Sequence, residues 1–192
     1  FTQDQLKEDL DVFFGSLEEI HSGLFRYYSK DDYEADKAAA YQAANRSLST
    51  IDLYRIIVRI SGKISDSHTN LWPPRSTKKY MLDSMVDVLP LTVCFVSDNV
   101  HVLNQLNDSA SLLIGQKIEQ INHRGIDEII AAMMELVPTD AGNVAVKKQW
   151  IEEFFGYYHY FLYGSSEQYE LVLNGNVYYT SATTIDDPGF KP

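Results

Sequence analysis

Ile64-Ser65-Asp66-Ser67-His68-Thr69-Asn70-Leu71 is the stretch that decides how this chain is interpreted. It follows a segment with helical periodicity and leads into Trp72-Pro73-Pro74, where that periodicity stops. A second pattern, Gly115-Gln116-Lys117-Ile118-Glu119-Gln120-Ile121-Asn122, comes later and has the alternation of a short strand after a turn. The order of the two patterns indicates a helical region followed by a different, strand-containing module.

The bulk composition narrows the classes of protein to consider. A chain of 192 residues that is 45% hydrophobic can bury a sizeable core in one or two domains. Its net charge of −11 argues against a nucleic-acid partner, which would require clustered Lys and Arg. No apolar run is long enough to span a bilayer. Cys94 is the single cysteine, so the chain cannot form an internal disulfide.

The first part of the chain predicts a small bundle of three helices. Residues 4–21 place apolar side chains at helical spacing, and a second helix is expected to start near Asp31 or Asp32 and to run through Leu48. Ser49 or Thr50 can cap a third helix that ends near residue 62. We therefore expect an N-terminal helical domain over residues 1–75, with a boundary in the segment 73–79.

The second part predicts an α+β module over residues 80–184. Strands are expected at 89–96 and 100–106, and residues 112–115 then 117–121 are expected to give another short strand after a turn. Further strands are expected at 169–173 and 177–181, and helices at 128–136 (capped by Asp127) and 144–162. Asn174-Gly175 predicts a tight hairpin turn, because both residues accept positive φ. The helix at 144–162 is rich in aromatic residues and is called the aromatic helix below. Its periodicity predicts a buried stripe at 150, 151, 154, 155, 158, 161 and 162, with Tyr157 and Tyr160 facing outward.

His68 is the principal candidate for chemistry. An imidazole can act as a general base near neutral pH, although a histidine between Ser67 and Thr69 can equally be an ordinary turn residue. The chain contains no Gly-x-Ser-x-Gly elbow for a nucleophile. If His68 is catalytic, its serine lies outside these residues, and this chain alone is expected to be inactive.

The two patterns together resemble the tail-specific, C-terminal-processing and tricorn-core serine peptidases. In that family a helical region and a PDZ-like module precede a core domain that bears the nucleophilic serine. The resemblance implies that Ser67-His68 matches the catalytic Ser-His pair of the tricorn-like branch, whereas the C-terminal-processing branch uses a serine and a lysine in the core. It further implies a peptide or unfolded-protein substrate, a catalytic core beyond residue 192, and export to the cell envelope.

A non-catalytic PDZ-like module that binds a peptide or a protein is the alternative function. Such modules bind an extended peptide by strand addition. Two departures weaken this expectation: Pro90 stands where a carboxylate-binding loop needs N–H donors, and Gln116 replaces a common acidic residue. The sequence does not identify peptide-binding residues.

The sequence predicts neither a metal site nor a cofactor. The remaining histidines do not have ligand spacing, and the chain has no Cys-x-x-Cys. Asp140-Ala141-Gly142-Asn143 lacks the regular oxygen positions of a calcium loop and is interpreted as a turn before the aromatic helix.

Overall fold

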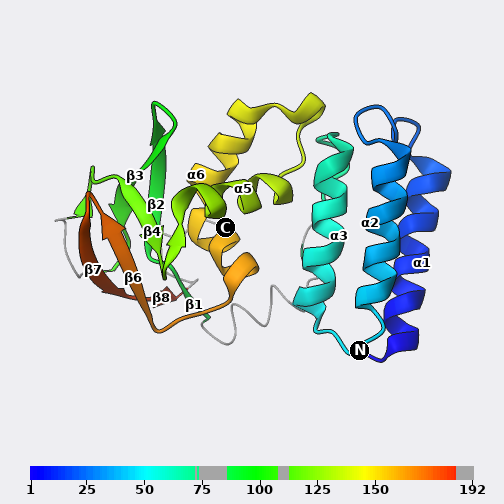
Figure 1. Ribbon diagram of the computed structural model, residues 1–192, viewed down its shortest axis with the longest axis horizontal. Helices are drawn as coiled ribbons and strands as arrows, with labels where there is room; N and C mark the ends of the chain where they lie inside the picture. The colour runs from blue at the N-terminus through cyan, green and yellow to red at the C-terminus, as the bar shows by residue number, and fades with distance from the viewer. Residues whose placement is uncertain (72, 74–85, 108–112, 185–192) are drawn as a thin grey trace. The chain divides into compact units, whose positions relative to one another are not determined.

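The computed structural model describes residues 1–71, 73, 86–107 and 113–184. The chain divides into two compact units, Phe1–Thr77 with Glu135–Asn143, and Lys78–Met134 with Val144–Pro192. Most of the boundary segment expected at 73–79 lies outside the described residues. The elements confirm the predicted α+β class, since three N-terminal helices precede a region that contains both sheets and helices (Figure 1).

The first unit contains the three expected helices, α1 (Gln3–Ile20), α2 (Lys30–Ala43) and α3 (Thr50–Ile64). Each begins at a hydroxyl N-cap that accepts a backbone N–H, namely Thr2, Ser29 and Ser49. Helix α2 thus starts beside Asp31, as predicted, but its N-cap is Ser29, so the expectation that Asp31 or Asp32 caps it was wrong. The prediction that this helix continues to Leu48 was also wrong, although Leu48 is buried in the core of the unit.

Apolar side chains from all three helices form the core of this unit. Helix α1 buries one face, which carries Leu6, Leu10, Phe14 and Leu17. Helices α2 and α3 complete the core with further apolar residues, among them the fully buried Tyr33. Burial of each large apolar side chain stabilises the bundle by roughly 1.5–3 kcal/mol. The loop that follows α3 therefore begins from a helix packed into this core.

Residues 135–143 pack against α3 in the same unit, and Gly62 permits the contact. A Cβ atom on Gly62 would lie 2.1 Å from the carbonyl oxygen of Glu135. Arg59, one turn earlier, forms an ion pair with the Glu135 carboxylate at 3.5 Å. The absence of a side chain at Gly62 thus allows the backbone of residue 135 to approach α3.

Two glycine-to-alanine variants are expected to have opposite effects on stability. Gly62→Ala should lower the free energy of unfolding by roughly 1–3 kcal/mol, because backbone must move to admit the methyl group. Gly15→Ala is the matched control: no neighbouring atom lies within 4 Å of its added Cβ, so the better helix former should raise stability by about 0.5–1 kcal/mol. Urea denaturation of both variants measures this, and a Gly62→Ala variant as stable as Gly15→Ala would contradict the close approach.

The described residues of the second unit form three sheets. Strands β1 (Asp87–Val88) and β8 (Thr183–Thr184) pair, and β2 (Leu91–Val96) pairs with β3 (Asn99–Gln105). The four-stranded sheet has the order β5-β4-β6-β7, from β4 (Ile118–Ile121), β5 (Arg124–Gly125), β6 (Gln168–Leu173) and β7 (Asn176–Ser181). All the described pairs are antiparallel. The helices are α5 (Ile126–Leu136), whose last two residues belong to the first unit, and α6 (Val144–Tyr163).

Local turn chemistry explains the hairpins of this unit. Asn174 and Gly175 both have positive φ between β6 and β7, as predicted. Of the short strand expected from 112–115 and 117–121, only β4 is a strand, and residues 113–115 form the turn that precedes it. Helix α5 begins at Ile126, which places Asp127 in its first turn, where a carboxylate favours the helix N-terminus, and not at the cap.

The aromatic helix α6 departs from the predicted stripe. Phe154 has the non-helical dihedrals φ −120°, ψ 26°, which mark a kink within the helix. Phe155 and Tyr160 are buried, whereas Phe154 and Tyr157 are half-buried. The expectation that Tyr160 faces outward was therefore wrong, because a kink changes which side chains share a face after it.

Candidate functional site

The loop that carries His68 begins where α3 ends. Ser65, the residue after Ile64, adopts a left-handed conformation with φ 58° and ψ 45°, which turns the chain away from the helix axis. Asp66 then closes the loop, since its backbone oxygen accepts a hydrogen bond from the Thr69 N–H at 3.1 Å. The expected placement of His68 directly after a helix is confirmed.

Side chains of helix α3 form hydrogen bonds with the C-terminal part of this loop. The Ser61 hydroxyl, which is fully buried, donates to the backbone oxygen of Thr69 at 2.5 Å. The Tyr54 hydroxyl donates to the backbone oxygen of Leu71 at 3.1 Å. The C-terminal part of the loop is thus tied to the helix that precedes it.

The 3₁₀ turn η2 (Asp140–Gly142) in the same unit forms hydrogen bonds with the first residues of the loop. The Ser67 N–H donates to Oδ1 of Asp140 at 2.9 Å, and the Ala141 N–H donates to the backbone oxygen of Ser65 at 3.1 Å. The sequence indicated only a turn at Asp140. Its role as an acceptor for Ser67 was missed, because no local pattern reveals a partner 73 positions away.

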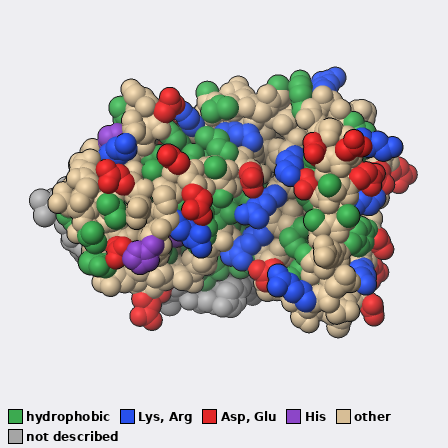
Figure 2. Space-filling view, in the orientation of Figure 1, with side chains coloured by type: hydrophobic (Ala, Val, Ile, Leu, Met, Phe, Trp, Pro, Cys, Tyr) green, Lys and Arg blue, Asp and Glu red, His purple; other side chains and the backbone are tan. Residues whose placement is uncertain are grey.

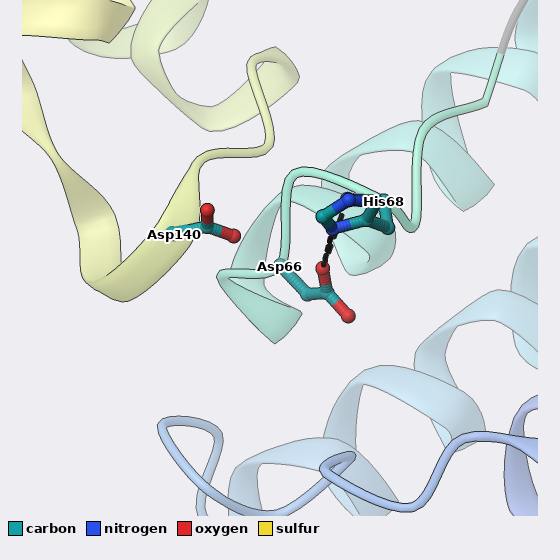
Figure 3. Close-up of side chains that lie close together, drawn as sticks. All are labelled: Asp66, His68 and Asp140. Atoms are coloured by element: carbon teal, nitrogen blue, oxygen red, sulfur yellow. Dashed lines mark hydrogen bonds and ion pairs between the residues drawn. The ribbon is translucent and has the colours of Figure 1, made fainter.

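Asp66 and His68 form the centre of the site (Figure 3). Oδ1 of Asp66 accepts the His68 backbone N–H at 2.8 Å and lies 3.4 Å from Nδ1 of the His68 ring. The His68 side chain is 90% exposed. The ring therefore has one nitrogen against a carboxylate and the other free for a molecule from solvent.

Hydrogen bonds keep both carboxyl groups of the site ionised. The backbone N–H of His68, assisted by the rings of His21 and His68, holds the pKa of Asp66 below its usual range. The Ser67 N–H, followed by the Ser67 hydroxyl, holds the pKa of Asp140 below its usual range. At neutral pH the His68 ring thus lies close to two negative charges.

Ser67, predicted as a catalytic partner of His68, makes its described contacts with Asp140. Its side chain is exposed. The structure brings Ser67 and His68 together only as neighbours in one loop, and these contacts hold that loop to residue 140.

The described residues contain one group that could offer three ligand atoms to a divalent ion. Asp66, His68 and Asp140 each provide an atom, and these atoms lie within 4.8 Å of one another. The Asp66 oxygen that faces the ring and one Asp140 oxygen already accept backbone N–H groups. Because exposed acidic groups commonly gather without an ion, we base no function on metal binding here.

A pocket of about 220 Å³ lies beside the site within the first unit. It is lined by the connection between α1 and α2 and by the loops at 64–66 and 140–141, and Arg26 is its basic residue. The buried histidine of the second unit, His159, is a poor candidate for a base, since burial lowers its pKa to about 4. Two exposed histidines lie beside a carboxylate: His68, and His123 in the second unit, whose Nδ1 is 2.9 Å from Oε1 of Glu170. Only His68 belongs to the loop described above.

The second unit offers little support for peptide binding on β2. The Phe95 N–H donates to Oε1 of Glu152 on α6 at 2.7 Å. Lys148, also on α6, lies over the Phe95 ring at 5.0 Å. A peptide that added to this strand at Phe95 would have to displace the Glu152 carboxylate.

The surface carries mixed charge. Acidic and basic side chains are interspersed on the face shown in Figure 2. Among the described residues, the helices are too short or too polar to cross a membrane.

The chain thus consists of a three-helix unit with a histidine–aspartate pair in the loop after α3, followed by a small α+β unit. No protein-family model matches the sequence, and no curated protein matches it. Solved structures do match: mature CPAF complexed with lactacystin at a TM-score of 0.63, and mature CPAF at 0.56, both with 13% identity over 94% of this chain. The chain spans about a third of the CPAF chains, 34% in each case. At this identity the likeness shows the fold alone.

Proposed function

We propose that this chain forms the N-terminal part of a serine peptidase of the tail-specific or tricorn-like type. His68 serves as the general base, and the nucleophilic serine belongs to a core domain outside these 192 residues. The observation that carries the proposal is the pairing of the His68 ring with an ionised Asp66 in a rigidly anchored, solvent-exposed loop. The structural likeness to CPAF, a chlamydial tail-specific-protease-like serine protease, supports it.

The proposed reaction is peptide-bond hydrolysis through an acyl-enzyme. Nε2 of His68 accepts the proton of the serine hydroxyl as the serine oxygen attacks the scissile carbonyl carbon. The imidazolium then gives this proton to the leaving amine, and water hydrolyses the ester with His68 again as base. The negative charges of Asp66 and Asp140 stabilise the imidazolium that forms in each step.

Ser67 has a supporting role in this proposal. Its N–H and hydroxyl hold Asp140, so it fixes the loop and takes no part in bond making. A peptide or unfolded-protein substrate and a location at the cell envelope belong to the same proposal, since they follow from the family likeness. The binding-module alternative is less well supported, because Glu152 already occupies the Phe95 N–H on β2.

A fluorophosphonate probe tests the proposal, since it labels only an activated serine. The 192-residue chain should remain unlabelled, whereas a longer gene product that includes the core should be labelled on one serine beyond residue 192. In that product His68→Ala should abolish labelling, and the matched variant Ser67→Ala should retain it. Specific labelling of a serine within the 192 residues would refute the proposal.

A further inference from the structure

Asp66 lies between two histidines, one on each carboxylate oxygen. Nε2 of His21 is 3.0 Å from Oδ2, and Nδ1 of His68 is 3.4 Å from Oδ1. His21 is the residue that ends α1, where its backbone N–H caps the helix by donating to Leu17. A residue from a different helix thus reaches the loop that carries His68.

The charge of Asp66 decides where the protons of both rings lie. An ionised carboxylate can only accept hydrogen bonds, and the pKa of Asp66 is held below its usual range. Nε2 of His21, at hydrogen-bond distance from Oδ2, must therefore carry a proton, and Oδ1 at 3.4 Å favours a proton on Nδ1 of His68. A neutral His68 ring with its proton on Nδ1 has its lone pair on Nε2, and a general base needs that lone pair.

The two histidines differ in burial in a way that suits two roles. The His21 side chain is 14% exposed, and the His68 side chain is 90% exposed. An enclosed ring can fix the orientation of the carboxylate, whereas an exposed ring can meet a nucleophile. Oδ2 receives one further contact, a weak one from the Thr69 hydroxyl at 3.4 Å, so His21 is its principal donor.

We infer that His21 is a positioning residue: it holds Asp66 by Oδ2, so that Oδ1 fixes the His68 ring with its proton on Nδ1. The inference rests on the proposed function, because it assigns His21 to the preparation of His68 as a base. The competing explanation is that His21 only ends α1 and fastens the loop. That explanation predicts no effect on the proton position in a ring that His21 does not touch.

Nitrogen NMR of the isotope-labelled 192-residue chain distinguishes the two explanations, because ring-nitrogen shifts report the tautomer of each neutral histidine. At a pH where the rings are neutral, we expect the Nδ1–H form of His68 in the unaltered chain. His21→Leu should convert His68 to a mixture of tautomers. His21→Gln should preserve the Nδ1–H form, because the side-chain amide can donate to Oδ2. His123→Leu in the second unit is the control and should change nothing at His68.

Asp66→Asn provides a test that survives if His21→Leu fails to fold. The amide has a donor at one end in place of a second acceptor, so at least one of the two rings must change its tautomer. In the peptidase that contains this chain, His21→Leu should lower kcat/KM roughly 10- to 100-fold with little change in KM, by analogy with partners of metal-bound histidines. His21→Gln should recover most of the activity.

The outcomes separate this inference from the proposed function. An unchanged His68 tautomer in His21→Leu overturns the inference, whatever the enzyme assay gives. A tautomer that responds to His21, in a protein whose hydrolysis does not require His68, refutes the proposed function and with it the contribution of His21 to the reaction rate. A responding tautomer together with loss and recovery of kcat/KM supports both.

Discussion

Replacement of His68 by alanine is expected to lower kcat of the peptidase that contains this chain by roughly 10²- to 10⁴-fold, as loss of a general base does. The serine hydroxyl would then have no acceptor for its proton at the moment of attack. Stability should be unaffected, because the side chain is 90% exposed and its backbone N–H bond to Asp66 remains. Steady-state hydrolysis of an unfolded protein substrate measures the rate, and urea denaturation verifies the fold.

His101→Ala is the matched control for this prediction. His101 is a half-buried histidine of β3 whose Nδ1 is 3.1 Å from the backbone oxygen of Gly115, and it has no part in the proposed mechanism. Its variant should retain the rate of the unaltered enzyme. A His68→Ala enzyme that is equally active would move the mechanism to a serine–lysine pair in the core domain and leave His68 as a turn residue.

The pH dependence of the rate follows from the same site. Asp66 and Asp140 have folded-state pKa values below their usual range, so the stability that they give the loop is present above the ordinary pKa of an aspartate. It is lost only as the pH falls through their lowered values. Between pH 5 and 8 the loop therefore stays intact, and a change of rate there does not come from protonation of Asp66 or Asp140.

Local signals allowed the secondary structure to be predicted. Ser49 with Asp52 forms a capping box at the start of α3, and Asn174-Gly175 forms the predicted hairpin turn. Such interactions join residues a few positions apart, so a single sequence contains them. The cap of α2 was not identified because Ser29, Asp31 and Asp32 are all good caps and composition could not choose among them.

Only some residues of the candidate site could be predicted from the sequence. His68 could be identified because a histidine after a helix in a Ser-His pair is itself a local pattern. His21 and Asp140 lie 45 residues before Asp66 and 73 residues after Ser67, and only the tertiary packing of the first unit brings them to the loop. Long-range hydrogen bonds of this kind leave no periodicity in a sequence.

The prediction of the buried face of the aromatic helix α6 was wrong for a different reason. Residues 154–163 are almost all apolar or aromatic, so several stripes fit a straight helix equally well. The kink at Phe154 then determines which side chains are buried after it. Periodicity assumes a regular helix and cannot locate such a break.

Phe155→Ala is expected to lower the free energy of unfolding of the second unit by roughly 3–5 kcal/mol, because Phe155 is 1% exposed and its loss leaves a cavity. Phe154→Ala is the matched variant. Phe154 is half-buried and stacks on Trp150 with a centroid distance of 5.5 Å, so its loss should cost only about 1–2 kcal/mol. Urea denaturation followed by tryptophan fluorescence and circular dichroism compares the two. Equal losses, or a larger loss for Phe154, would show that α6 is straight in solution and that the regular stripe, which includes both residues, describes its buried face.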